Sequence, residues 1–196
     1  MPFFRSCPVS LLFSGLFLWG CQKEPIHTYE VPKETVAPMV AGDAMTPAQV
    51  TPEITWSVPK GWQEAAPSSM RVGSFLIKGA NGEIADMSVV PLSGEAGGDL
   101  ENINRWRGQI QLRPLTRADL LAQGEWMSPG GRKMLYINFV SHELMIHGRF
   151  KKRLIAAIYH QQNRTWFFKL LGEDATVLSA KPAFLQFLRS LKFNEN

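Results

Sequence analysis

A turn signal between two strand-like segments constrains this fold more than any other feature of the chain. An apolar run over residues 71–78 is followed by Asn81 and Gly82, a pair that favours a tight hairpin turn. Behind the turn, two sets of side chains alternate, as in a strand with one buried face. The apolar set is Ala85, Met87 and Val89, and the polar set is Asp86 and Ser88. The pattern predicts an antiparallel β-hairpin.

Four further segments carry strand patterns. They are residues 55–58, 133–140, 153–159 and 165–171. The last two are separated by a short polar loop, at a spacing that suits a second hairpin. In the last segment Trp166, Phe168 and Leu170 share one face and Phe167 projects from the other, which favours a central strand covered on both sides. An exposed Phe167 would instead mark a docking patch.

Helical periodicity is confined to three segments. The first starts near Asp99, a good N-cap residue, and the second starts at Thr116, which has Asp119 at the spacing of a capping box. The last has Pro182 in its first turn, where proline is tolerated. The apolar stripes of the first and last helices are Leu100, Ile103, Trp106 and Ile110, and Phe184, Phe187, Leu188 and Leu191. Helices gathered on a mostly antiparallel sheet of six or seven strands predict an α+β sandwich.

The chain begins with a segment that we leave out of this fold. Arg5 supplies a positive charge, and the uncharged apolar run from Pro8 to Gly20 is about 13 residues long, within the range of a signal-peptide core. A helix that spans a bilayer needs about 20 apolar residues. Residues 1–20 are therefore predicted to be a signal peptide rather than a membrane anchor.

Cys21 stands directly behind this run. Leu18, Gly20 and Cys21 resemble the lipobox of bacterial lipoproteins, although Trp19 is bulkier than the usual residue there. The resemblance implies cleavage before Cys21, diacylation of its sulfur and acylation of the new amino terminus; an ordinary secretory signal is the alternative. Gln22 is not the aspartate that marks inner-membrane retention in many Gram-negative lipoproteins. We therefore expect an anchor in the cell membrane or, where one exists, the outer membrane, with the domain facing the periplasm.

The residues after Cys21 have the composition of a linker. Residues 22–52 contain five prolines, few aromatic residues and no hydrophobic period, so they cannot bury enough apolar surface to fold. We expect residues 21–52 to be a semi-extended tether and residues 53–196 to be a single α+β domain. Because Cys7 leaves with the signal peptide, this domain has no disulfide and depends on its core for stability.

Two arginines in the first predicted helix stand out. At about 100° per residue, Arg107 falls on the apolar stripe and Arg105 on nearly the opposite side. A guanidinium on a core-facing stripe must be paired or hydrogen-bonded. Arg107 could hold the glycine-rich loop before the helix, could pair with Asp86, or could line a cleft that receives an anion. Arg105, Arg107, Asp86 and the intervening Trp106 are our candidate contacts for a ligand or partner, although Trp106 is expected in the core.

A basic run at residues 147–153 is the second candidate region. Its cations are Arg149, Lys151, Lys152 and Arg153. They could attract anionic lipid headgroups or another polyanion. A charged edge strand or hairpin is the alternative, because lysines on exposed strands prevent edge-to-edge pairing. The formal net charge of +4, of which Arg5 supplies one unit, is too small to indicate a nucleic-acid partner.

Motifs for catalysis, metals and cofactors are weak. The loop at residues 94–98 lacks both the Gly-Lys-Ser/Thr ending of a P-loop and the spacing of a dinucleotide fingerprint. His142 and His147 are five residues apart, which does not suit the usual metal-ligand pairs, and Glu143 does not complete a site. The chain has no Gly-x-Ser-x-Gly elbow. We therefore predict no enzyme activity, no metal and no cofactor.

Several short motifs together resemble a group of uncharacterised bacterial exported lipoproteins. They are Trp56-x-Val-Pro-x-Gly-Trp62, Asp86-x-Ser-Val89, Gly97-Gly98, Asn104-Arg-Trp-Arg-x-Gln109 and Trp166-Phe-Phe-Lys169. The resemblance covers most of residues 53–193 and brings no activity with it. The order of strands, middle helices and terminal helix is also similar to the PsbP-like α/β/α sandwich, whose members mostly dock onto other proteins or assemblies. No site residues are carried over.

These observations predict a lipid-anchored domain of the cell envelope that binds a partner protein or an envelope component without catalysis. The alternative is a periplasmic receptor for a small ligand or an anion, with Arg105 or Arg107 in its pocket. The two hypotheses predict different surfaces. A docking module presents a broad apolar or basic patch, whereas a receptor presents a concave pocket with converging polar groups.

Overall fold

Seven antiparallel strands form the main sheet. The computed structural model describes residues 53–66 and 68–194. The strands are β2 (Trp62–Glu64), β3 (Gly73–Lys78), β4 (Ile84–Ser93), β5 (Glu125–Met127), β6 (Met134–Ile146), β7 (Phe150–Gln161) and β8 (Arg164–Glu173). Their order is β2-β3-β4-β8-β7-β6-β5, and every neighbouring pair is antiparallel. A second, small sheet pairs β1 (Ile54–Thr55) with β9 (Lys192–Phe193).

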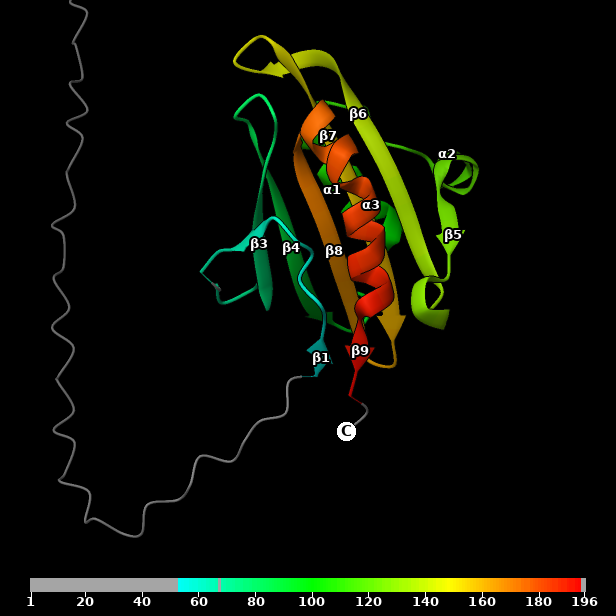
Figure 1. The fold of residues 1–196 in the computed structure, drawn as a ribbon. Helices are drawn as coiled ribbons and strands as arrows, with labels where there is room; N and C mark the ends of the chain where they lie inside the picture. Colours follow the sequence, from blue (N-terminus) through cyan, green and yellow to red (C-terminus); the bar gives the residue numbers. More distant parts are fainter. Residues whose placement is uncertain (1–52, 67, 195–196) are drawn as a thin grey trace, which may run out of the picture. The chain divides into compact units, whose positions relative to one another are not determined.

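Helices cover both faces of the main sheet. α3 (Asp174–Ser190) lies on one face and α1 (Asp99–Gly108) on the other, as Figure 1 shows with α3 in front and α1 behind. α2 (Arg117–Gln123) follows α1, and the short 3₁₀ helix η1 (Pro129–Gly131) lies between β5 and β6. The prediction of an α+β fold, with helices packed on a mostly antiparallel sheet of six or seven strands, is confirmed.

The core under α3 is built around aromatic rings. The ring centroids of Trp56, Trp62 and Phe75 lie 5.7, 5.6 and 5.9 Å from that of Phe187 on α3. The predicted apolar set of the first hairpin, Ala85, Met87 and Val89, is fully buried in the same core. Because large aromatic side chains dominate core energetics, the two tryptophans of the Trp56–Trp62 motif serve to hold α3 on the sheet.

The core under α1 uses the other face of the same strands. Trp106 packs edge-to-face on Phe167, with ring centroids 5.4 Å apart. The other buried members include Ile103, Ile137, Phe139, Leu154 and Ile158. β8 is therefore covered on both sides, as its sequence predicted, and Phe167 is buried rather than exposed.

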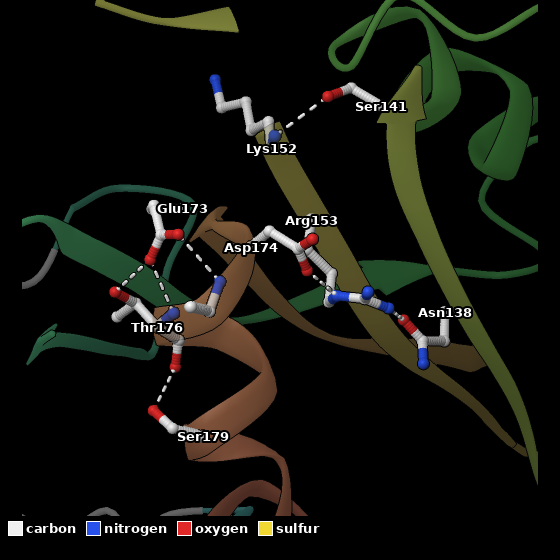
Figure 2. A network of polar contacts seen from close by, with 9 residues as sticks. Asn138, Ser141, Lys152, Arg153, Glu173, Asp174, Thr176 and Ser179 are labelled. Atoms are coloured by element: carbon white, nitrogen blue, oxygen red, sulfur yellow. Dashed lines mark hydrogen bonds and ion pairs between the residues drawn. The ribbon is translucent and has the colours of Figure 1, made fainter. Parts of the chain in front are cut away.

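The start of α3 differs from the prediction. The helix begins at Asp174, so Pro182 lies in its interior and not in its first turn. Glu173, the last residue of β8, acts as the N-cap: its carboxylate accepts hydrogen bonds from the backbone of Ala175 at 2.9 Å and from the backbone and hydroxyl of Thr176 at 2.7 Å each (Figure 2). A buried residue at the end of a strand thus caps the helix, which begins eight residues before the proline.

The other local predictions hold to within a few residues. α2 has the predicted capping box between Thr116 and Asp119. α1 includes Asp99 in its first turn, with Gly98 as the N-cap residue at φ 90°. The first hairpin pairs β3 with β4, but residues 79–83 form a five-residue loop in place of a two-residue turn.

The anchor region remains a prediction. Cys21, the signal peptide at residues 1–20 and the linker at residues 21–52 lie outside the residues that the structure describes. Within residues 53–66 and 68–194, no helix combines the length and the apolar character needed to cross a membrane.

Candidate functional site

Arg107 holds the loop that follows α1. Its side chain is nearly buried, and its Nε donates a hydrogen bond to the carbonyl of Arg113 at 2.8 Å. The guanidinium carbon lies 4.6 Å from the ring centroid of Phe139, in a cation–π contact. Burial lowers the pKa of Arg107, and the charge of Asp119 acts in the opposite direction. Asp86 pairs with Arg71 instead, so the alternative in which Arg107 pairs with Asp86 is wrong. The contacts of Arg107 are those of a residue that holds the loop after α1.

Two asparagines of α1 fix the loops on either side of the helix. Asn104 donates to the carbonyl of Leu115 at 3.0 Å and accepts from its backbone N–H at 2.6 Å. Asn102 donates to the carbonyls of Ala96 and Gly98 at 2.8 and 2.7 Å. The contact with the glycine-rich loop, one of the alternatives considered for Arg107, is thus made by Asn102, which lies five residues earlier on the helix.

Lys169 is the central cation on the α1 face of the sheet. It belongs to β8, and its Nζ donates to the side-chain oxygen of Gln109 at 3.2 Å. The Nζ also lies 6.0 Å from the ring centroid of Trp106. Gln109 is the C-cap residue of α1, so Lys169 sits in the angle between the end of this helix and the sheet.

Charged side chains from four other positions surround Lys169. Asp86 lies on the neighbouring strand β4, one position along the same face, and accepts from Arg71 at 2.9 Å. Arg105 lies one turn before the end of α1 and is exposed, while Lys152 lies on the other neighbour, β7. Burial lowers the pKa of Lys169, the three cations lower it further, and Asp86 opposes them. We call these five residues the Lys169 cluster.

The sheet beside this cluster is open on the α1 side. α1 contacts β8 and β6 through the ring of Trp106 and the guanidinium of Arg107. The same core takes in Val90 and Leu92 in the second half of β4, and β3 and the first half of β4 lie beyond it. Ile84, two residues before Asp86 on β4, is 50% exposed, and Val72, directly before β3, is 49% exposed. The cluster therefore lies at the margin of α1, next to a part of β3 and β4 that no described helix covers.

A separate apolar hollow lies between α1, α2 and β5. Its volume is 310 Å³, and its apolar walls come from Leu100, Leu120, Leu121, Trp126 and Leu135. The side chains of Leu121 and Trp126 are 76% and 55% exposed, which is unusual for residues of this size. We call this hollow the Trp126 groove. Sequence reasoning missed it, because its two exposed walls, Leu121 and Trp126, belong to a seven-residue helix and a three-residue strand that carry no usable period.

The groove lies beside the edge of the main sheet. β5 is the terminal strand on that side, and it pairs only with Met134–Tyr136 of β6. Trp126 is paired with Leu135, whose side chain belongs to the α1 core, so Trp126 lies on the groove side of β5. Among the described residues, no strand pairs with the outer edge of β5.

The basic run does not form a single surface. Arg153 is neutralised by Asp174, with Nε and Oδ1 2.5 Å apart, and donates to Asn138 at 2.7 Å (Figure 2). Lys152 is its neighbour on β7 and points to the opposite face of the strand, as successive strand residues do. The prediction of one basic surface made of all four cations is therefore wrong.

The two remaining cations of the run are at the β6–β7 hairpin. Arg149 is exposed in the turn, and its guanidinium carbon lies 5.3 Å from the ring centroid of Phe150. Lys151 is exposed at the start of β7. This position matches the alternative interpretation of the run as a charged hairpin.

A polar hollow of 260 Å³ lies near the paired strands β1 and β9. Its walls include Glu53, Gln161, Asn163 and Arg164. Arg164 and Glu53 form an ion pair with each other, so the two opposite charges are already matched. In the part of the chain that the structure describes, no group of three or more His, Cys, Asp or Glu side chains is arranged to hold a metal ion.

Comparison with known proteins finds only distant structural likenesses. No protein-family model matches the chain, and no curated protein matches it in sequence. A protein from Bacteroides thetaiotaomicron VPI-5482 is 13% identical with a TM-score of 0.44, over 74% of this chain and 46% of that one, so this chain spans less than half of it. LpqN, involved in cell envelope biogenesis of Mycobacterium tuberculosis, is 13% identical with a TM-score of 0.44, over 75% of this chain and 88% of LpqN. Neither likeness supports an inference about function.

Proposed function

We propose that this protein is a lipid-anchored binding module of the cell envelope that holds an extended segment of a partner protein in the Trp126 groove. The lipobox-like residues before Cys21 support the anchor, and the proline-rich composition of residues 21–52 supports a tether. The observation that carries the binding proposal is the exposure of Leu121 and Trp126 above an apolar hollow of 310 Å³.

An apolar side chain fits this hollow better than a polar one. Large exposed apolar side chains at the rim of a pocket mark binding sites, and tryptophan is enriched among the residues that contribute most to interfaces. Glu101 and Arg117 lie on the rim and offer one charge of each sign for polar contacts around an apolar anchor. A partner segment with one or two large apolar side chains satisfies both features.

The open edge of β5 favours an extended segment as the occupant. The outward main-chain groups of a terminal strand are free to pair with an added strand. A strand added to β5 places alternate side chains on the α1 face, next to Trp126, where the groove begins. Main-chain pairing and the apolar anchor therefore act on the same segment.

Site-specific photocrosslinking in cells tests this proposal. A photoreactive amino acid replaces Leu121 in the full-length chain, and the matched control replaces Leu178, which is half-exposed on α3 on the other side of the sheet. We expect one crosslinked protein from position 121 that is absent from position 178. Mass spectrometry of the crosslink should place it in an apolar, extended segment of that protein.

The affinity of the protein for a synthetic peptide of the crosslinked segment is then measured. Trp126→Ala should weaken its binding by about tenfold or more, and Leu178→Ser should leave it unchanged, since loss of a central aromatic contact costs more than about 1.4 kcal/mol. Equal crosslinking from positions 121 and 178 would contradict the proposal. Crosslinks from position 121 only to a second copy of this chain, or only to lipid, would also contradict it.

A further inference from the structure

The Lys169 cluster carries more positive than negative charge. It contains four cations and one carboxylate, and the carboxylate of Asp86 is already engaged by Arg71. Arg105 and Lys169 donate to the neutral side chains of Asn102 and Gln109. Within residues 53–66 and 68–194, neither of these two cations forms an ion pair.

The excess of positive charge in the Lys169 cluster destabilises the folded domain. A half-buried ammonium loses part of its hydration, and nearby like charges add repulsion. Both effects act on Lys169, whose pKa is lowered by burial and by the surrounding cations. A neutral side chain at the same position would pack against Trp106 without that cost. A ligand of opposite charge would remove the repulsion, so the cluster has the electrostatics of an anion-binding site.

We propose that the Lys169 cluster binds the acid head of a single anionic amphiphile, with a carboxylate or phosphate between Lys169 and Arg105 and a hydrocarbon body over the open sheet beside them. The guanidinium and ammonium groups suit an oxyanion. The apolar body is suited by Val72 or Ile84, which are both exposed and lie toward opposite ends of the β3–β4 pair. This site is separate from the Trp126 groove, and the proposal does not depend on that groove.

The position of Lys169 favours a single molecule over a membrane surface. Its Nζ contacts the C-cap residue of α1 and the ring of Trp106, so it lies at the foot of the helix rather than on its outer surface. An α-helix with its side chains is about 10 Å across. A packed lipid surface that rests on α1 is therefore held away from Lys169, whereas one molecule can enter along the open strands.

Titration with defined amphiphiles tests the proposal. The full-length chain carrying Cys21→Ser, which cannot be acylated at that position, is titrated with monomeric decanoate and followed by amide NMR shifts. Acetate provides the head without the tail, and decyltrimethylammonium provides the tail with the opposite charge. We expect saturable binding of decanoate, with the largest shifts at Asp86, Ser88 and Lys169, and at least about tenfold weaker binding of both other probes.

Variants that each remove one charge distinguish binding at the Lys169 cluster from general electrostatic attraction to a basic protein. Lys169→Gln should weaken decanoate binding by about tenfold and Arg105→Gln by at least about threefold, because each removes a charged partner of the head group. Arg189→Gln removes the same charge from an exposed position on α3 and should change the affinity less than about twofold. Asp86→Asn should strengthen binding, because it frees Arg71 and removes the only carboxylate of the cluster. Circular dichroism confirms that each variant is folded.

Three results would overturn the proposal. The first is an equal effect of Lys169→Gln and Arg189→Gln on affinity. The second is tighter binding after loss of Lys169 together with weaker binding of Asp86→Asn. The third is binding only to anionic vesicles or to an acidic peptide, with no saturable shift from decanoate.

Discussion

The two faces of the main sheet are built by the same strands and differ in how they are covered. On the α3 face, a 17-residue helix lies over aromatic rings, and Trp56 and Trp62 close the core from the side of β1 and β2. On the α1 face, a 10-residue helix covers β8, β7, β6 and the second half of β4, and leaves β3 and the first half of β4 without a covering helix. β8 shows the contrast within one strand: Trp166, Phe168 and Leu170 face α3, whereas Phe167 and Lys169 face α1.

The contrast suggests that the core of the α3 face mainly stabilises the fold, whereas the exposed groups of the α1 face mainly bind ligands. The α3 face is apolar and closed, so substitutions in its core should act on folding. The α1 face retains half-buried charge and exposed apolar side chains, two features that do not stabilise a domain of this size and that ligands use. Substitutions of these half-buried charges and exposed apolar side chains should act on binding and change folding little, whereas substitutions in the core under α1 should still act on folding.

The largest effect is expected from Phe187→Ala. Phe187 is fully buried and lies at the centre of four aromatic contacts, so its truncation should lower the free energy of unfolding by about 3–5 kcal/mol. Urea denaturation followed by tryptophan fluorescence measures this change. Leu178→Ala on the same helix is the control, because Leu178 is half-exposed. A loss below about 1 kcal/mol for Phe187→Ala would show that the α3 core is not the main source of stability.

The cap of α3 should give the next largest effect. Glu173→Ala removes three hydrogen bonds to the first turn and should cost about 1–2 kcal/mol. Burial alone would raise the pKa of Glu173, but its hydrogen bonds from Thr176 and Ala175 outweigh this and lower it. The contribution of Glu173 is therefore complete above the ordinary pKa of glutamate and is lost as the pH falls through the lowered folded value. The difference in free energy of unfolding between the wild type and Glu173→Ala, measured by urea denaturation, should become smaller at acidic pH. A difference that does not change with pH would contradict the role of Glu173 as the cap.

Lys169→Met should change stability in the opposite direction. Removal of a half-buried cation from among other cations is expected to have no effect or to stabilise the domain by up to about 1 kcal/mol. Because the pKa of Lys169 is lowered on folding, the unfolded chain binds more protons at alkaline pH. The stability of the wild-type domain should therefore rise towards that of the variant as the pH increases. Marked destabilisation by Lys169→Met would make this lysine a structural residue.

The smallest effect on stability is expected at the Trp126 groove. Leu121→Ser should change the free energy of unfolding by less than about 0.5 kcal/mol, because the side chain is 76% exposed. Thermal and urea denaturation of the two proteins measure this difference. A larger loss would show that Leu121 packs against its neighbours and that the groove is part of the core.

Much of the fold could be predicted where the local pattern was strong. The hairpin after residue 78, the two-sided burial of β8 and the capping box at Thr116 all follow from short-range signals. The start of α3 could not be predicted, because Glu173 becomes a cap only when β8 ends beside the first turn of the helix. The strands β2, β5 and β9 are too short to carry a period.

The candidate sites were only partly predictable. The helical wheel showed that Arg107 needed a partner, but the partner is a carbonyl in a loop whose path depends on tertiary packing. Asp86 and Arg105 were named among the same candidate contacts. The sheet register places Asp86 and the end of α1 places Arg105 on one surface, around Lys169. A signal for Lys169 was available, because it shares a strand face with the buried Phe167 and is the only charged residue between Thr165 and Leu171.

The pairing of β1 with β9 has a mechanical consequence. Ile54 lies opposite Phe193, and the backbone N–H of Asn194 bonds to the carbonyl of Glu53, so both ends of the described domain leave at the same point. A pulling force applied between these two ends would load this short ladder first and would reach the seven-stranded sheet only after the ladder had opened. The β1–β9 ladder would therefore open before the main sheet when the two ends of the domain are pulled apart.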